Sequence, residues 1–312
     1  MISLSGLLVF VCAGTMFSQA PPDPLSAQRA LISSGSLDKA EISLQAYLKE
    51  HPASADAHFL LGYVFFHQKR PKDSLAEFTE GAKGRRPTAD ELTIVASDYV
   101  LLKDFSDADK WFSEVTIQTP YNANAWYLLG RTKYNEQRFD EAISCFERSL
   151  SLRPRYVEAE NNKGLALRGL DKMDLAKVAF QNAIDWQGDA PTDAQPYLNL
   201  GSLLADQGEL DRAISLLTKA VNLSPENPKA HEQLAAAYLS QGDLPKAQHE
   251  MEIATTLSPD TSALHFKLGQ IYRRQKLVDL AQHEFAICEK LNSTHSSTET
   301  PNPFAPKSAT PK

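Results

Sequence analysis

The apolar residues of this 312-residue chain recur at intervals of three and four positions. This spacing places them along one face of an α-helix, whereas a half-buried β-strand would alternate apolar and polar residues. No segment of the sequence alternates in that way. The pattern therefore predicts an all-α protein.

The helical pattern itself repeats along the chain. Units in one register start at residues 21, 55, 89, 123, 157, 194, 228 and 262, and every interval is 34 residues except the 37 between 157 and 194. Position 20 of each unit is small, as expected where two helices approach closely: Ala40, Ser74, Ala108, Ala142, Ala176, Ala213, Ala247 and Ala281. Position 24 is large and apolar, as expected of a core residue: Leu44, Phe78, Phe112, Phe146, Phe180, Leu217, Met251 and Phe285.

Proline and glycine mark the ends of the predicted helices. Proline lacks the amide that a following helical turn would need, so it ends the second helix of a unit. It stands at position 32 in five units: Pro52, Pro120, Pro154, Pro225 and Pro259. Gly35, Gly208 and Gly242 fall between the two helices of their units, where a left-handed backbone favours glycine. The extra residues before Ala194 predict a longer loop over 187–193.

The unit from Ala123 to Tyr156 carries the most specific motif. It contains Trp126, Leu129-Gly130, Ala142, Phe146 and Pro154 at fixed offsets. In this respect it resembles the tetratricopeptide repeat (TPR), a 34-residue helix–turn–helix unit that must stack on neighbours to bury its apolar face. The resemblance covers about residues 21–294 and implies a right-handed α-solenoid of about eight repeats.

The two ends of the chain differ from the repeats. Residues 1–20 contain an uncharged apolar run around Leu7–Val11 and end in Ser18-Gln19-Ala20, which predicts a secretory signal peptide cleaved after Ala20. The alternative is an uncleaved N-terminal membrane anchor, since no Lys or Arg lies near Met1. We therefore expect export to the periplasm or the medium, without membrane insertion after cleavage. Residues 295–312 are rich in Ser, Thr and Pro and are expected to be disordered.

Composition and motifs indicate no chemistry of their own. The formal charge of −7 and the pI near 5.7 argue against a nucleic-acid partner. The sequence has no P-loop, GxSxG or HExxH motif, so we expect no catalytic residue, metal ligand or cofactor. His58, His231 and His265 all stand at position 4 of their units, as Trp126 and Tyr197 do, which indicates packing. Cys145 and Cys288 lie too many repeats apart to form a disulfide.

The resemblance also implies where a partner would bind. In TPR proteins the first helices line a concave groove, usually with positions 2, 5, 9, 12 and 13. Carried over, these positions give Phe59, Tyr63, Phe66, His67, Asn124, Tyr127, Arg131, Tyr134, Asn135, Asn161, Arg168, Phe266, Gln270, Arg273 and Arg274. The alternative is that Phe59, Phe66 and Tyr134 pack between repeats and that only Tyr63 and Tyr127 are exposed.

The sequence therefore predicts a non-enzymatic scaffold, located in the bacterial envelope, that binds a peptide or protein in this groove. One alternative is a structural component that self-associates through its terminal helices, where Leu280, Ile287 and Leu291 are expected to be partly exposed. Another is an accessory subunit of an envelope enzyme or secretion complex.

Overall fold

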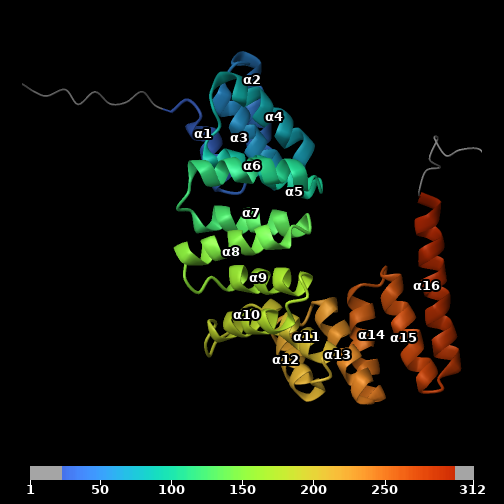
Figure 1. Cartoon of the computed structure of the whole chain (residues 1–312). Helices are drawn as coiled ribbons and strands as arrows, with labels where there is room; N and C mark the ends of the chain where they lie inside the picture. The colour runs from blue at the N-terminus through green and yellow to red at the C-terminus, as the bar shows by residue number, and fades with distance from the viewer. Residues whose placement is uncertain (1–22, 299–312) are drawn as a thin grey trace, which may run out of the picture. The chain divides into compact units, whose positions relative to one another are not determined.

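The computed structural model describes residues 23–298, which form sixteen α-helices and no strand (Figure 1). The all-α repeat fold predicted from the sequence is confirmed: within each of the two compact units described below, consecutive helices pack on one another. The chain divides into two compact units, Met1–Leu102 and Lys103–Lys312, which are described separately below. The predicted signal peptide, residues 1–20, lies outside the described residues. None of the helices within residues 23–298 has the length and apolar character needed to cross a membrane.

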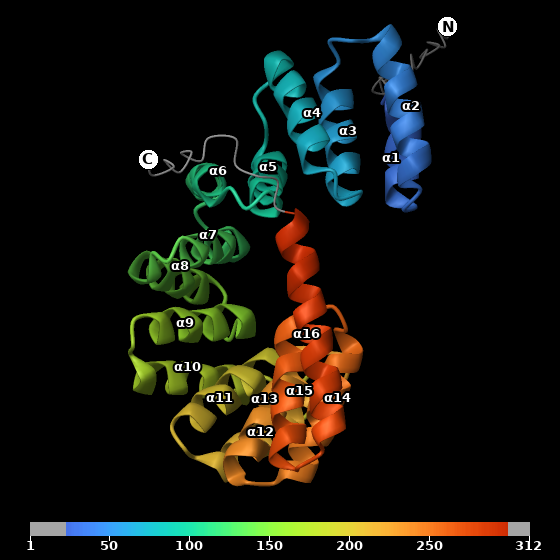
Figure 2. The same cartoon turned by 90° about the vertical axis from the view of Figure 1, so that its right-hand side faces the viewer.

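The first unit contains five helices, coloured from blue to teal in Figure 2. They are α1 (Ser26–Ser33), α2 (Leu37–Glu50), α3 (Ala55–His67), α4 (Pro71–Gly84) and α5 (Ala89–Leu101). Each packs on the next in sequence, and the first helices α3 and α5 also touch. The helix α1 begins only at Ser26, although this repeat starts at residue 21 in the sequence register.

The second unit contains eleven helices within the described residues. They are α6 (Phe105–Gln118), α7 (Ala123–Asn135), α8 (Phe139–Leu152), α9 (Val157–Gly169), α10 (Met173–Asp185), α11 (Gln195–Asp206), α12 (Leu210–Leu223), α13 (Pro228–Gln241), α14 (Leu244–Leu257), α15 (Ser262–Arg274) and α16 (Val278–Thr298). The predicted loop over 187–193 separates α10 from α11. The Gln187 side chain holds this loop, because its Oε1 accepts from the amides of Thr192 and Asp193.

The end of α16 differs from the sequence pattern. The apolar period stops at Leu291, but the helix continues to Thr298. Residues 295–298 of the predicted disordered tail therefore lie in the helix, and residues 299–312 lie outside the described residues. Leu280 is exposed, and Ile287 and Leu291 are half-buried, as expected for the last helix of the array.

The core depends on a small residue facing a large one inside each helix pair. All eight residues at position 20 are buried, and so are the position-24 side chains of the first seven repeats. Glycine at position 8 faces the ring of position 24. A Cβ added to Gly130 would lie 2.7 Å from Phe146, and one added to Gly164 would lie 2.6 Å from Phe180. Both distances are far below van der Waals contact, so the helices approach as closely as they do only without a side chain there.

The turn between the two helices has a left-handed residue in all eight repeats. Gly35, Gly208 and Gly242 adopt positive φ angles, as predicted. In the other five repeats the same position 15 holds a non-glycine residue with φ between 60° and 65°: Lys69, Lys103, Gln137, Asp171 and Lys276. A left-handed conformation costs a non-glycine residue roughly 1–2 kcal/mol, so packing of the two helices imposes this turn.

Charged side chains near this turn join neighbouring repeats. Arg138 pairs with Asp109 of the preceding repeat at 2.8 Å. Between the fifth and sixth repeats the equivalent positions carry the opposite charges, and Lys177 pairs with Glu209 at 2.6 Å. Because these side chains are partly exposed, each pair contributes at most about 1 kcal/mol. These pairs therefore contribute more to the alignment of neighbouring repeats than to the free energy of unfolding.

Asp98 on α5 is a buried carboxyl group whose ionised form is poorly compensated. The residue is fully buried, and neither carboxylate oxygen accepts a hydrogen bond of good geometry within the described residues; the nearby Ser74 side chain favours the ionised form, but burial outweighs it. Burial raises the pKa of Asp98 from its ordinary 3.8 to about 7. Because the unfolded chain loses this proton near pH 4 and the folded chain only near pH 7, folding becomes less favourable as the pH rises between these values.

We expect Gly242→Ala to lower the free energy of unfolding by about 1 kcal/mol, because alanine must adopt the left-handed conformation. No other atom lies within 4 Å of the added Cβ, so the effect is one of the backbone alone. Lys276→Ala, at the same position of the next repeat, is the matched control and should change stability by less than about 0.5 kcal/mol. Urea unfolding of the three proteins measures both values. Equal losses of unfolding free energy in Gly242→Ala and Lys276→Ala would contradict the assignment of the effect to the left-handed backbone at Gly242.

We expect Asp98→Asn to stabilise the protein at pH 8, by on the order of 3 kcal/mol, and to have little effect at pH 4. The wild type should lose stability from pH 4 to pH 7, whereas the variant has no carboxylate to ionise. Thermal unfolding midpoints across this pH range test the expectation. Parallel pH profiles for the two proteins would refute it.

Candidate functional site

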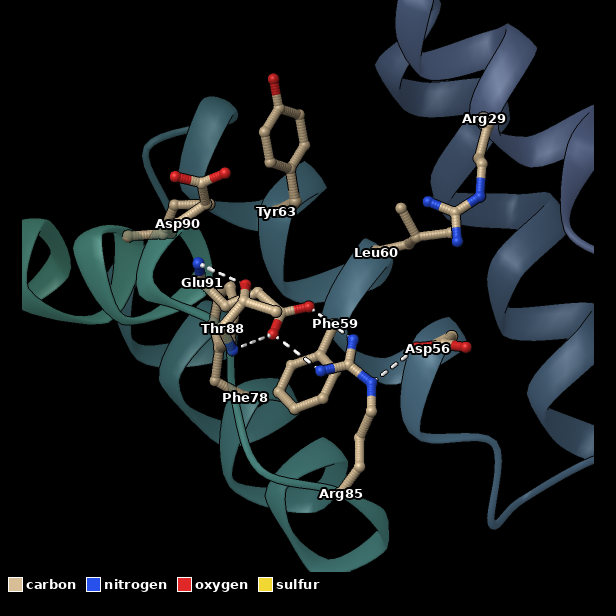
Figure 3. A pocket seen from close by; sticks show the side chains of 11 residues that line it. Arg29, Asp56, Phe59, Leu60, Tyr63, Phe78, Arg85, Thr88, Asp90 and Glu91 are labelled. Atoms are coloured by element: carbon tan, nitrogen blue, oxygen red, sulfur yellow. Dashed lines mark hydrogen bonds and ion pairs between the residues drawn. The ribbon is translucent and has the colours of Figure 1, made fainter. Parts of the chain in front are cut away.

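A hollow of about 220 Å³ lies in the first unit, where the first helices α1, α3 and α5 contribute side chains (Figure 3). Position 9 supplies Arg29 and Tyr63, and position 2 supplies Asp56 and Asp90. The complete lining is Arg29, Asp56, Phe59, Leu60, Tyr63, Phe78, Arg85, Thr88, Asp90, Glu91 and Ile94. Three consecutive repeats therefore build one site from equivalent positions.

The floor of the hollow is aromatic. Asp56, Phe59 and Tyr63 are spaced three and four residues apart on α3, which places them on one helix face. Phe59 packs on Phe78 with ring centroids 5.7 Å apart and is only 3% exposed. Its edge therefore contributes to the floor while most of the ring is part of the repeat core.

One wall is a rigid network around Arg85. Its Nε donates to Asp56 at 2.8 Å, and its two terminal nitrogens donate to Glu91 at 2.9 and 2.6 Å. The guanidinium also lies 4.2 Å above the Phe59 ring. Burial opposes the charge of Glu91, but hydrogen bonds from Arg85 and from the Thr88 amide outweigh it and lower the pKa of Glu91. Arg85 therefore holds the wall in place and has little capacity left for a ligand.

Other polar groups remain available. Figure 3 shows Tyr63 and Asp90 on one side of the hollow and Arg29 on the opposite side. Asp90 is exposed, and neither it nor the Tyr63 hydroxyl has a partner within the described residues. Arg29 pairs only through its Nε, with Asp23 at 3.0 Å. The site can thus receive an apolar side chain on its floor and hydrogen-bond a peptide backbone at its rim.

The residues that the TPR resemblance placed in the groove of the second repeat do not all line the hollow. Phe59 and Tyr63 line the hollow, whereas Phe66 is half-buried against His67 with centroids 5.2 Å apart and does not line it. Arg29, Asp56 and Asp90 were missed. The same positions 2 and 9, applied to the first and third repeats as well, would have found them.

The fourth repeat, in the second unit, carries a separate aromatic cluster. Tyr127 packs on Tyr156 with centroids 5.1 Å apart, and Arg131 lies 5.7 Å from the Tyr127 ring. Burial raises the pKa of Tyr127. The Tyr156 hydroxyl donates to Asn124 at 3.3 Å. Sequence analysis missed Tyr156 because position 34 is outside the usual groove set.

The remaining implied groove residues are exposed to different degrees. Tyr134 is half-buried against Phe139, with centroids 5.5 Å apart, and Asn135 is exposed. In the last repeat, Gln270 is half-buried, whereas Phe266, Arg273 and Arg274 are exposed. These last three form an open surface on α15.

The fifth repeat corrects one expectation. Asn161 was expected on the groove surface, but it is only 5% exposed, and its Oδ1 accepts from Asn199 at 2.9 Å. Arg168, also expected in the groove, donates to Asp206 at 2.9 Å. Both side chains connect α9 to α11, and sequence spacing could not reveal partners that lie one repeat away.

The three histidines at position 4 form one recurring structural motif. Nδ1 of His58, His231 and His265 contacts a glutamate at 2.6, 2.6 and 2.7 Å, and each Nε2 contacts a proline carbonyl at 2.8 to 3.0 Å. Trp126 donates to Pro120 in the same way. The glutamates are Glu77, Glu250 and Glu284, always 19 residues after the histidine. Within residues 23–298 no cluster of His, Cys, Asp or Glu could hold a metal ion.

We expect His58→Gln to lower the thermal unfolding midpoint most below pH 6.5. Burial disfavours the imidazolium, but the hydrogen bonds to Glu77 and Pro52 outweigh it, so the pKa of His58 is raised above 6.5. The resulting stabilisation is complete below the unfolded pKa and is lost as the pH rises through the folded pKa. The difference between wild type and variant should therefore shrink at alkaline pH. His67→Gln, exposed on the same helix, is the control, and a pH-independent difference for His58→Gln would contradict the assignment.

Comparison with known proteins agrees with this geometry. Family models described as tetratricopeptide repeat match residues 28–90 and 172–231, residues 123–156, and residues 204–271. The tetratricopeptide repeat-containing protein trd-1 of Caenorhabditis elegans is 23% identical over 192 residues, which are 61% of this chain and 24% of that protein. Human protein O-mannosyl-transferase TMTC1 is 28% identical over 180 residues, 56% of this chain and 20% of that protein. The chain thus spans about a quarter or less of the length of these relatives.

Solved structures show the same fold. A tetratricopeptide repeat protein from Parabacteroides merdae superimposes with a TM-score of 0.65 at 19% identity, over 83% of this chain and 97% of that one. A chain of the APC/C hetero-tetramer Cut9–Hcn1 gives 0.62 at 17% identity, over 86% and 52%. Together with the eight in-phase repeats, these matches establish that the chain belongs to the tetratricopeptide repeat family.

Proposed function

We propose that this protein is a non-enzymatic scaffold that binds an extended segment of a partner protein in the hollow of its first unit. The observation that carries the proposal is the convergence of groove positions 2, 5 and 9 from α1, α3 and α5 on one hollow with an aromatic floor. An interface anchor is usually an apolar or aromatic side chain in such a pocket, surrounded by polar groups.

The chemistry of the hollow limits what it receives. Arg85 is engaged by Asp56 and Glu91, so the wall does not attract a ligand carboxylate. The floor of Phe59 and Phe78 fits an apolar side chain of the partner. Tyr63 and Asp90 then lie where they can hydrogen-bond the amides of an extended backbone.

The second unit offers further contact surfaces. Arg131 and Asn135 are exposed beside the Tyr127 cluster, and Phe266, Arg273 and Arg274 are exposed on α15. Aromatic and arginine side chains are common in interface centres. We assign them to additional partner contacts, each within its own part of the array.

The proposed location is the bacterial envelope, after export and removal of residues 1–20. This proposal rests on the apolar run Leu7–Val11 and the small residues at Ser18 and Ala20. Amino-terminal sequencing of protein purified from a periplasmic extract tests it. A chain that begins at Met1 and pellets with membranes would indicate the anchor instead.

A second candidate is self-association through the last helix. Val278 and Leu280 are exposed at the start of α16, and such apolar residues can pack on another copy. Sedimentation velocity over a range of protein concentrations distinguishes the two candidates. A constant monomer mass rules out self-association.

We expect Tyr63→Ala to weaken peptide binding about tenfold, since loss of an interface anchor costs about 1–2 kcal/mol. Peptides would be selected from a random dodecamer display library on the wild-type protein and measured by fluorescence polarisation. Asp90→Asn should weaken the same peptides less.

Tyr121→Ala is the matched control, because Tyr121 is highly exposed and does not line the hollow. Circular dichroism confirms that each variant remains helical. Selected peptides that bind wild type and Tyr63→Ala equally well would refute the groove assignment.

A further inference from the structure

A second hollow, of about 190 Å³, lies within the second unit and is lined by α8, α9 and α10. Most of its lining comes from the second helices α8 and α10, whereas the groove residues of the proposed function lie on first helices. It is therefore a separate surface from the hollow beside Tyr63, and nothing argued for that site depends on it.

The repeat register explains why this hollow exists. In the other repeats after the first, an aromatic ring occupies position 4 or position 23, which face each other across the helix pair. The rings belong to His58, Trp111, Trp126, Tyr197, His231 and His265. The fifth repeat has Glu160 at position 4 and Ala179 at position 23. Both line the hollow, so the space that a ring fills elsewhere stays open here.

Glu160 does not take the place of the ring. Its Oε1 accepts from Asn182 at 3.1 Å, and its Oε2 pairs with Lys163 at 2.8 Å. The side chain is buried and held within α9 and α10. A carboxylate oxygen accepts two hydrogen bonds, so each oxygen retains capacity for another donor.

The rim of the hollow is unusually apolar. Leu175 and Val178 are each 56% exposed, and Ile143 lines the hollow on α8. The equivalent positions 19 and 22 are charged, polar or small in the repeats on either side: Glu141 and Ser144 before, Arg212 and Ser215 after. The apolar rim therefore belongs to the one repeat that also has the hollow.

The charges of the lining favour a cation. Glu147 and Glu160 supply two carboxylates and Lys163 one ammonium, which leaves a net charge of −1. Glu147 is exposed and makes no ion pair among the described residues. A ligand that enters the hollow therefore contacts apolar side chains at the rim and carboxylate oxygens inside it.

We propose that this hollow binds an arginine side chain of a partner protein. The guanidinium is planar, always charged and donates without accepting, so it can fill a ring-shaped space and bond Glu147 and Glu160. Its methylene stem would lie along Leu175 and Val178. The chain already packs one arginine between apolar and acidic groups, since Arg85 lies 4.2 Å from the Phe59 ring while it pairs with two carboxylates. The formal charge of −7 also favours a basic partner.

The test is an NMR titration of the full chain with labelled leucine and valine methyl groups. The probe is N-acetyl-L-arginine methylamide, and its neutral isostere is the citrulline analogue. We expect saturable shifts at Leu175 and Val178 with the arginine probe and about tenfold weaker binding of the citrulline analogue, since hydrogen bonds to charged groups contribute about 1.5–3 kcal/mol.

Two variants make the test specific. Glu160→His combined with Ala179→Glu recreates the histidine–glutamate pair of the neighbouring repeats, so the protein should fold, fill its own hollow and lose the shifts. Glu147→Gln should weaken binding severalfold, whereas Glu226→Gln, on an exposed loop elsewhere, should not. An unchanged thermal midpoint for each variant excludes unfolding as the cause.

Four results would overturn the proposal. The first is equal binding of the arginine and citrulline probes, and the second is persistence of the shifts in the double variant. The third is tighter binding of N-acetyl-L-tryptophan amide, which would make the hollow an apolar anchor site. The fourth is a shift of Leu175 and Val178 with protein concentration alone, which would assign the surface to contacts between copies of this chain.

Discussion

Close approach of the two helices within a repeat is the constraint on which the structure depends. In five repeats a glycine at position 8 lies directly against the large residue at position 24, as Gly130 faces Phe146. Once that contact is made, the turn between the helices has little freedom. This explains why Lys69 and Gln137 adopt the same left-handed conformation as Gly208, at some cost in backbone energy.

Stacking of the repeats adds a second layer of specific contacts. In four repeats position 4 carries a ring that reaches back to the proline carbonyl of the preceding repeat, and glutamate at position 23 contacts the imidazole in three of them. Such contacts are local, as is usual in repeat arrays, where each repeat contacts its neighbours. They also leave positions 2, 5 and 9 of the first helices free to vary, and these positions form the hollow around Tyr63.

Most of the fold could be predicted from the sequence because the repeat register carries the core. The spacing of small, large and proline positions predicted the all-α repeat fold and the loop over 187–193. It could not identify the left-handed Lys103 or Asp171, since packing overrides their intrinsic preference. The site was predicted less completely. Phe59 and Tyr63 line the hollow, but Asn161 is bonded to Asn199 one repeat away, a contact that depends on the rotation between repeats and not on spacing.

Asp98 has a consequence for how the array unfolds. In a linear array each repeat is held only by its neighbours, so the repeat with the least favourable internal energy is where cooperativity is lost. The third repeat contains a buried carboxyl group whose ionised form is poorly compensated, and the division between the two compact units falls at its Leu102. Ionisation of this one carboxyl group therefore lowers the stability of the repeat at which the chain divides into its two compact units.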